Sequence, residues 1–162
     1  MIVRLRPPTP EDGRFLVRMA SAEVAGEFNY FADDVDRLTA GDVGAGRMII
    51  ELEDGTLVGD LGWFGVPYGP NRRSVAWRIG CTMDVPYRGR GYGSQAQRLL
   101  AEHLFATTSS NRVEADTDVE NVAERRALER AGFTRDGVVR GGQYRGGRWH
   151  DLLLYSLLRS DV

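Results

Sequence analysis

The spacing of apolar residues along the chain predicts short strands and helices. Residues 2–6 alternate apolar and basic side chains, which is the pattern of a half-buried strand. Thr9 then reads as a helix N-cap, with a proline at the first helical position and an acid at the third. We therefore expect a helix over residues 10–21, with Phe15, Leu16 and Met19 on its buried face.

A three-stranded meander is expected in the middle of the chain. Residues 48–53 and 56–66 flank Asp54-Gly55, a strong short-range hairpin signal. A turn-rich segment at residues 67–71 separates them from a further strand over residues 74–83. Between the first helix and this meander, residues 25–46 lose all periodicity and predict a short helix followed by a loop.

The second half of the chain alternates helices and strands. Apolar residues at helical spacing predict a helix that ends near Phe105, and residues 112–117 predict a strand. A helix over residues 121–131 is closed by Gly132, and a final hairpin turns at Gly146-Gly147. The predicted order is βα(α)βββαβαββ, which makes residues 1–162 a single α+β domain without internal repeats.

Composition excludes several kinds of protein. All 21 basic side chains are Arg, so a Walker A loop, a pyridoxal Schiff base and a Ser-Lys dyad are excluded. Cys81 and only two histidines form no zinc motif, so we expect no metal and a buried structural thiol. A net charge of −2 and the lack of a long apolar run predict a cytoplasmic protein that binds neither nucleic acid nor membrane.

A glycine-rich loop carries the most informative chemistry. It reads Arg88-Gly89-Arg90-Gly91-Tyr92-Gly93 and lies between a predicted strand and a predicted helix. Glycines let a phosphate approach several backbone N–H groups, the helix directs its positive end to the same place, and two arginines add charge. The dinucleotide fingerprint G-x-G-x-x-G does not fit, because these glycines alternate with single residues. The loop therefore predicts a pyrophosphate site.

With this loop the chain resembles the GNAT superfamily of acyl-CoA N-acyltransferases along nearly its whole length. The loop is similar to the family's (Q/R)-x-x-G-x-(G/A) cofactor motif, and the helix from Asn121 to Gly132-Phe133 is similar to the one that follows it there. The start at residues 5–12 and the end at residues 147–158 look most like the branch named after ribosomal-protein N-terminal (alanine) acetyltransferases.

The resemblance implies a mixed central sheet of about seven strands flanked by helices, and a direct attack of a primary amine on acetyl-CoA. The strand that ends at residues 83–85 would hold the pantetheine arm where it separates from the next strand, and a backbone N–H near Met83 would polarise the thioester. The cofactor-binding residues that it implies are Met83, Val85, Arg88, Gly89, Arg90, Gly91, Tyr92, Gly93, Ser94, Asn121 and Arg126, with Arg125 as a further phosphate contact.

Proton transfer is where the chain departs from the family. Arg78 occupies the position at which many relatives carry a Glu that acts as the general base. Leu128 stands where many relatives have a Tyr that protonates the departing thiolate, and Glu124 stands where this branch often has a Ser. Candidates for the catalytic groups are Asp116, Tyr144 and His150, an imidazole that can change charge near neutrality. The alternative for Asp116 is a solvated strand position, and the alternative for His150 is a surface histidine.

Two functions remain open from the sequence. The first is an acetyl-CoA-dependent N-acetyltransferase that acts on a protein N-terminus or a small-molecule amine, and the resemblance allows a homodimer. The second, favoured by the departures at Arg78, Glu124 and Leu128, is a catalytically weak sensor or regulatory module that binds acyl-CoA. An acceptor cleft lined by Asp33, Asp34 and Trp63 would favour a cationic amine.

Overall fold

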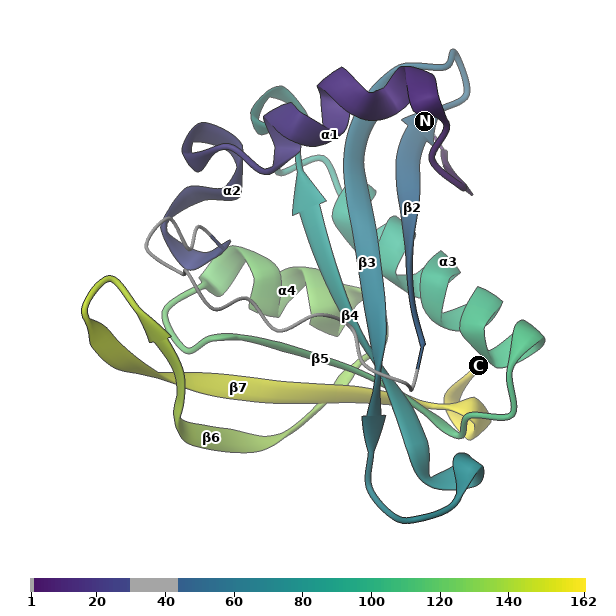
Figure 1. The fold of residues 1–162 in the computed structure, drawn as a ribbon, viewed down its shortest axis with the longest axis vertical. Helices are drawn as coiled ribbons and strands as arrows, with labels where there is room; N and C mark the ends of the chain where they lie inside the picture. Colours follow the sequence, from purple (N-terminus) through teal and green to yellow (C-terminus); the bar gives the residue numbers. More distant parts are fainter. Residues whose placement is uncertain (1, 30–43) are drawn as a thin grey trace.

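The computed structural model describes residues 2–29 and 44–162 of the chain. One sheet joins all seven strands in the order β1-β2-β3-β4-β5-β7-β6 (Figure 1). The strands are β1 Val3–Arg6, β2 Ala45–Leu52, β3 Leu57–Pro67, β4 Val75–Met83, β5 Arg112–Asp118, β6 Thr134–Arg145 and β7 Arg148–Leu158. The helices are α1 Gly13–Met19, α2 Ala22–Asn29, α3 Tyr92–Thr107 and α4 Val122–Arg130, so the predicted element order and the mixed α+β sheet are confirmed.

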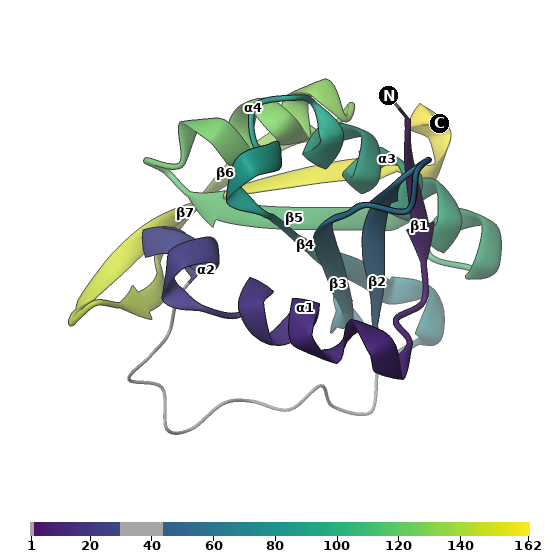
Figure 2. The same cartoon turned by 90° about the horizontal axis from the view of Figure 1, so that it is seen from above.

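The helices form a layer on each face of the sheet. Seen from above, α1 and α2 lie on one face, and α3 and α4 lie on the other (Figure 2). Neighbouring strands are antiparallel except β4 and β5, which run parallel and are connected through α3. This arrangement buries apolar side chains on the face that α3 and α4 cover.

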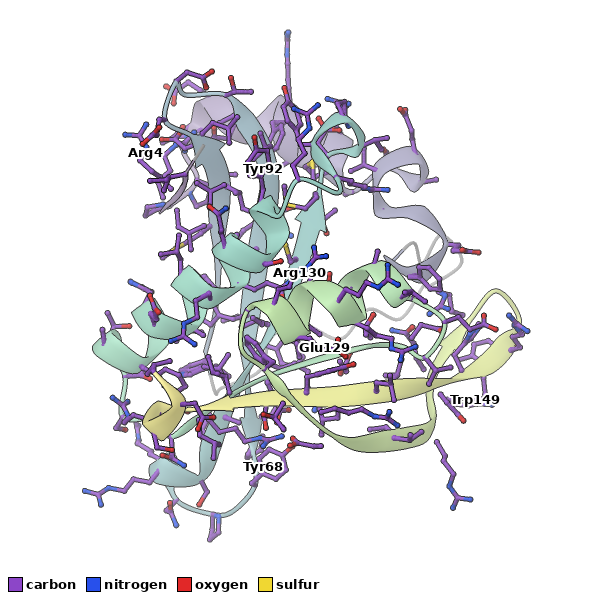
Figure 3. The ribbon with its side chains drawn as sticks, turned by 180° about the vertical axis from the view of Figure 1, so that it is seen from behind. Arg4, Tyr68, Tyr92, Glu129, Arg130 and Trp149 are labelled. Atoms are coloured by element: carbon purple, nitrogen blue, oxygen red, sulfur yellow. The ribbon has the colours of Figure 1, made fainter. Side chains whose placement is uncertain are left out.

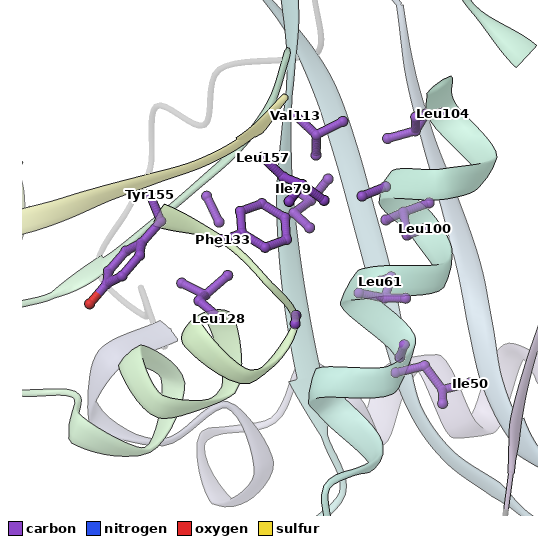
Figure 4. Close-up of a cluster of buried hydrophobic side chains, with 14 of the residues drawn as sticks. Ile50, Leu61, Ile79, Leu100, Leu104, Val113, Leu128, Phe133, Tyr155 and Leu157 are labelled. Atoms are coloured by element: carbon purple, nitrogen blue, oxygen red, sulfur yellow. The ribbon is translucent and has the colours of Figure 1, made fainter. Parts of the chain in front are cut away.

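The core fills the space between α3, α4 and the sheet (Figure 4). Leu100 and Leu104 of α3 are buried beside Ile50 and Leu61, and a second group around the end of α4 contains Leu128, Phe133, Tyr155 and Leu157. Each of these side chains exposes 4% of its surface or less. Full burial of one such side chain contributes about 1.5–3 kcal/mol relative to exposure, so this face of the sheet supplies much of the stability.

Local turn signals also lie where the sequence predicts them. Gly55 adopts a φ of 85°, and Gly146 and Gly147 adopt 56° and 77° at the final hairpin. Gly132 ends α4 with a φ of 94°. The predicted first helix differs in detail, because residues 10–12 form a 3₁₀ turn before the α-helix begins at Gly13.

The sheet opens between β4 and β5. Pairing between these parallel strands is limited to Trp77 with Val113 and Arg78 with Glu114, although β4 continues to Met83 and β5 to Asp118. Beyond the last pair the facing backbone groups of the two strands have no ladder partner across the gap. An opening of this kind leaves hydrogen-bonding groups available to a ligand. None of the described helices is long and apolar enough to cross a membrane.

Candidate active site

The glycine loop forms a cradle at the start of α3. Gly91 is the N-cap of this helix and Gly89 precedes it, with φ values of 82° and 74° that favour glycine. A Cβ atom at either position would meet no atom within 4 Å, so this side of the loop is open. Among the described residues, no acceptor occupies the N–H groups of Gly89, Arg90, Gly91, Gly93 and Ser94. Such a set of free N–H groups at a helix N-terminus fits a phosphate.

A pocket of about 640 Å³ adjoins this cradle. Its walls come from the end of β4, the glycine loop, the start of α3, one side of α4, and residues 24–28 of α2. Figure 3 views the molecule from the side that α3 and α4 cover, with Tyr92 at the start of α3 and Arg130 on α4. Both residues line the pocket.

Most of the residues predicted to bind the cofactor meet in this pocket. They are Met83, Arg88, Gly89, Gly91, Tyr92, Gly93, Ser94, Asn121 and Arg126. Val85 and Arg90 do not line it. Val85 begins a 3₁₀ turn and exposes 43% of its surface, and the Arg90 guanidinium lies 5.8 Å from the ring of Tyr87. The role of the nine residues as cofactor ligands stays a prediction, but their convergence is a feature of the fold.

Arg88 lines the pocket and also holds its wall together. Its Nε donates to the carbonyl oxygen of Met83 at 3.0 Å, and its terminal nitrogen donates to the carbonyl oxygen of Val24. The guanidinium is therefore committed to backbone acceptors instead of pointing freely at a phosphate. It joins α2 to the end of β4 at the pocket wall.

The backbone of β4 offers a donor to the open side of the sheet. The N–H of Asp84 bonds to the carbonyl oxygen of Val58 on β3 at 2.9 Å. Because successive backbone groups of a strand point to opposite neighbours, the N–H of Met83 points away from β3 and toward the gap. This is the geometry that the sequence comparison with the family implies for polarising a thioester oxygen.

Helix α4 brings a carboxyl group to the pocket. Asn121 caps the helix by accepting from the N–H of Glu124 at 3.2 Å, and this first turn places the Glu124 side chain on the pocket wall. Gln97 of α3 donates from Nε2 to Glu124 Oε1 at 2.9 Å. Burial raises the pKa of Glu124 to about 7, against the opposing effect of the Gln97 hydrogen bond. Nothing in the sequence signals the raised pKa of Glu124, because the burial of this side chain depends on which side of α4 faces α3.

Other residues of α4 point elsewhere. Leu128 is fully buried in the core, so it fills space instead of contacting a ligand. Arg125 donates to the carbonyl oxygen of Val119 at 3.0 Å, and its buried Nε has no hydrogen-bond partner among the described residues. Arg126, in contrast, is exposed on the pocket side. Of the two arginines expected near a phosphate, Arg126 is the one at the pocket.

Asp116 is tied into a charged cluster on the opposite face of the sheet. Arg78 lies between Glu114, at 2.6 Å, and Asp116, at 3.1 Å. Burial raises the pKa of Asp116, and the Arg78 charge opposes that rise. Glu114 is fully buried, yet its hydrogen bonds with Arg112, Tyr68 and Arg78 outweigh burial and lower its pKa. Asp116 does not line the pocket, so the structure does not bring this candidate base to the cofactor side.

The other two candidate catalytic residues belong to the final hairpin. Tyr144 is 57% exposed and packs edge-on against Trp149, with ring centroids 5.3 Å apart. Trp149 lies near the turn between β6 and β7 (Figure 3). His150 contacts Asp118 at 2.9 Å and Arg145 at 3.1 Å, in a cluster that holds the hairpin against β5. Neither Tyr144 nor His150 lines the pocket.

The expected acceptor residues are only partly described. Asp33 and Asp34 lie outside the described residues. Trp63 packs against the core, and its ring closely approaches Gly46, where a Cβ would lie 2.1 Å from it. Phe28 of α2 lines the pocket, and the Arg145 guanidinium lies 5.7 Å from its ring.

Cys81 also lines the pocket, so it is not the fully buried structural thiol that the sequence suggests. Burial, together with the nearby Glu124 carboxyl, raises the pKa of this thiol well above its usual value. Cys81 therefore keeps its proton and offers the pocket a neutral wall. No group of three or more His, Cys, Asp or Glu side chains in residues 2–29 and 44–162 is arranged to hold a metal ion.

These features define an α+β protein with a phosphate cradle beside an open sheet, suited to a long phosphorylated ligand. A family profile described as an acetyltransferase (GNAT) domain matches residues 3–134. Because this match spans most of the chain, the chain belongs to the GNAT acetyltransferase family. It is an N-acetyltransferase with acetyl-CoA as its cosubstrate. A comparison with curated protein sequences gives no match.

Solved structures share this fold. RimJ of Mycobacterium smegmatis, in complex with CoA-disulfide, is 23% identical with a TM-score of 0.77 over 99% of this chain and 83% of its own. Spermidine N-acetyltransferase of Vibrio cholerae, in complex with CoA and spermine, is 17% identical with a TM-score of 0.77 over 98% of this chain and 96% of its own. RimL, a ribosomal L7/L12 alpha-N-protein acetyltransferase, is 19% identical with a TM-score of 0.77 over 98% and 94%.

Proposed function

We propose that this chain transfers the acetyl group of acetyl-CoA to a primary amine by direct attack of the amine on the thioester. The observation that carries the proposal is the pocket that joins the free N–H groups of the glycine loop to the end of β4, beyond its last pair with β5. The loop amides and Arg126 would hold the phosphates, and the N–H of Met83 would stabilise the charge that develops on the carbonyl oxygen. Holding both reactants in line supplies several kcal/mol of barrier reduction.

Two classes of acceptor are supported by the comparisons. RimL is described as acting on the N-terminus of a ribosomal protein, and the Vibrio enzyme is described as acting on spermidine. Glu27 and Phe28 border the same pocket and would suit a cationic amine of either class. A panel of short peptides with free N-termini and of polyamines, with CoA release as the readout, tests the proposal. Because Cys81 is a free thiol, the assay includes a blank without acceptor.

A second function is favoured by the positions of Asp116, Tyr144 and His150, none of which lines the pocket. A domain that binds acyl-CoA without efficient proton transfer would act as a sensor or regulatory module. Calorimetry with acetyl-CoA and the acceptor panel separate the two. Binding with transfer supports the enzyme, binding without transfer to any amine supports the sensor, and no binding rejects both. The cytoplasmic location and the homodimer expected from the sequence stay predictions.

A further inference from the structure

Glu124 is a half-buried carboxyl group of the pocket to which the sequence assigns no role. Glu124 lines the pocket from α4. Gln97 of α3 donates the 2.9 Å hydrogen bond to its carboxyl group. Gln97 is 1% exposed, and its Oε1 has no hydrogen-bond partner among the described residues. No ion pair with Glu124 is present within residues 2–29 and 44–162. A carboxyl group that lines a cleft and whose pKa is raised toward neutrality is a candidate for proton exchange.

The position of this pair relates it to the cradle. Gln97 follows Gly93 by one helical turn on α3, so the two residues lie on the same side of the helix. A Cβ atom at Gly93 would lie 3.5 Å from Met83 and 3.9 Å from the sulfur of Cys81. Glu124 therefore lines the pocket near Cys81, and Gln97, which does not line the pocket itself, holds it from one helical turn beyond the phosphate cradle.

We propose that Glu124 is the catalytic acid that protonates the departing sulfur, with Gln97 as the residue that positions it. This inference rests on the proposed transfer of acetyl from acetyl-CoA to an amine. The amine and the sulfur occupy opposite sides of the carbonyl carbon. Glu124 lines the same pocket as Cys81 and Gly93, and the sulfur-bearing arm lying past Cys81 would have the Glu124 carboxyl on its leaving side.

The step is balanced without any further reactant. The amine nitrogen bonds to the carbonyl carbon, the carbon–sulfur bond breaks, and its electron pair goes to sulfur. Glu124 gives its proton to that sulfur, and the proton released by the amine nitrogen restores the Glu124 carboxyl through solvent. An ordinary thiol has a pKa of about 8.5, so the sulfur takes a proton readily from an acid that titrates near neutrality.

Other titratable groups face the same pocket from each surrounding element. They are Glu27 of α2, Cys81 of β4, Tyr87 and Arg88 of the loop, Tyr92 of α3, and Arg126 and Arg130 of α4. The pKa of Glu124 is set by burial and by Gln97, and no charged neighbour contributes to the shift. A change of kcat with pH near 7 that is lost when Glu124 is replaced is therefore assigned to this residue.

The first test compares Glu124→Gln with the wild type and with Glu120→Gln, a matched loss of one carboxylate outside the pocket. Loss of a general acid lowers kcat by about 100-fold or more, and we expect KM for acetyl-CoA to stay within about threefold. Glu120→Gln should leave kcat unchanged. Equal kcat values for Glu124→Gln and the wild type would overturn the proposal.

The pH dependence distinguishes an acid from a base. The ratio of wild-type kcat to Glu124→Gln kcat, measured with one amine, cancels the protonation of the amine itself. For an acid this ratio falls as the pH rises above about 7, because the protonated carboxyl is lost. A ratio that rises over the same range would assign Glu124 as a base and overturn the proposal. If Glu124→Gln does not fold, Glu124→Asp is measured in its place, and it must show a lower kcat that still depends on pH near 7. A Glu124→Asp variant with wild-type kcat and no such pH dependence would overturn the proposal.

Two readouts do not require turnover. Carbon-13 NMR of labelled glutamate should show a carboxyl signal that titrates near pH 7 and disappears in Glu124→Gln. Calorimetry should show that the variant still binds CoA. If the wild type binds CoA and this signal titrates, but no amine is acetylated, the proposed function fails and the acid role fails with it. If transfer occurs and the signal is absent, only the role of Glu124 is overturned.

Discussion

Replacing Arg78 by Met tests the value of the charged cluster behind the sheet opening. The Arg78 guanidinium is 27% exposed and contacts Glu114, whose carboxyl is 0% exposed, at 2.6 Å. Breaking a buried ion pair by removing one partner costs about 3–5 kcal/mol of unfolding free energy. Arg112 and Tyr68 still bond to Glu114 after the change, so we expect the lower end, about 3 kcal/mol.

A matched control is available on α3. Arg98 pairs with Glu102 one turn away at 2.7 Å, and both side chains are solvated, with 33% and 46% of their surfaces exposed. An exposed pair at this spacing contributes about 0.3–0.5 kcal/mol, so Arg98→Met should destabilise the protein about six times less than Arg78→Met. Urea denaturation at pH 7, followed by tryptophan fluorescence, measures both values.

The pH dependence of Arg78→Met has a defined sign. Because the folded pKa of Glu114 is below its ordinary value of 4.5, its ion pairs add stability above that pH. This contribution is lost as the pH falls through the folded pKa. The difference between wild type and Arg78→Met should therefore be full at pH 7 and shrink in acid. Equal destabilisation by Arg78→Met and Arg98→Met, or a difference that does not change with pH, would refute this account of the cluster.

Three further substitutions have defined outcomes. Gly91→Ala places a side chain at positive φ, which costs about 1–2 kcal/mol, and it should also weaken CoA binding measured by calorimetry. Leu128→Ala removes a fully buried side chain and should lower the unfolding free energy by about 2–5 kcal/mol in urea, with CoA affinity retained. Asp118→Asn leaves the guanidinium of Arg145 and the ring of His150 without their carboxylate, and should cost about 3 kcal/mol in thermal denaturation at pH 7. A stable Asp118→Asn variant would show that the hairpin is held by its strand pairing alone.

The order of elements followed from local patterns because each pattern acts within a few residues. The hairpin at Gly55, the helix end at Gly132 and the turn at Gly146-Gly147 all depend on backbone angles that glycine adopts without strain. The loop around Gly91 was predicted for the same reason. These features need no knowledge of what lies opposite them in the fold.

The side-chain chemistry of the site was harder to predict because it depends on partners far away in the chain. Arg88 looks like a phosphate ligand in the sequence, and the sequence does not show that its guanidinium also donates to the carbonyl groups of Val24 and Met83. Asp116 looks like a free acid until Arg78 is placed beside it. Glu124 looks like a solvated residue of a helix start, and only the fold shows that it is half-buried and hydrogen-bonded to Gln97. Sequence spacing does not report these contacts.

The unpaired stretch between β4 and β5 makes the stability of the folded protein depend on the concentration of its ligand. The gap leaves strand hydrogen bonds unmade, and a ligand bound there can make some of them. Such a ligand stabilises the native state by an amount that grows with its concentration relative to its dissociation constant. At a concentration of about one hundred times its dissociation constant, the gain is about 2.7 kcal/mol. The resistance of this protein to heat and proteases should therefore rise and fall with the supply of its acyl donor.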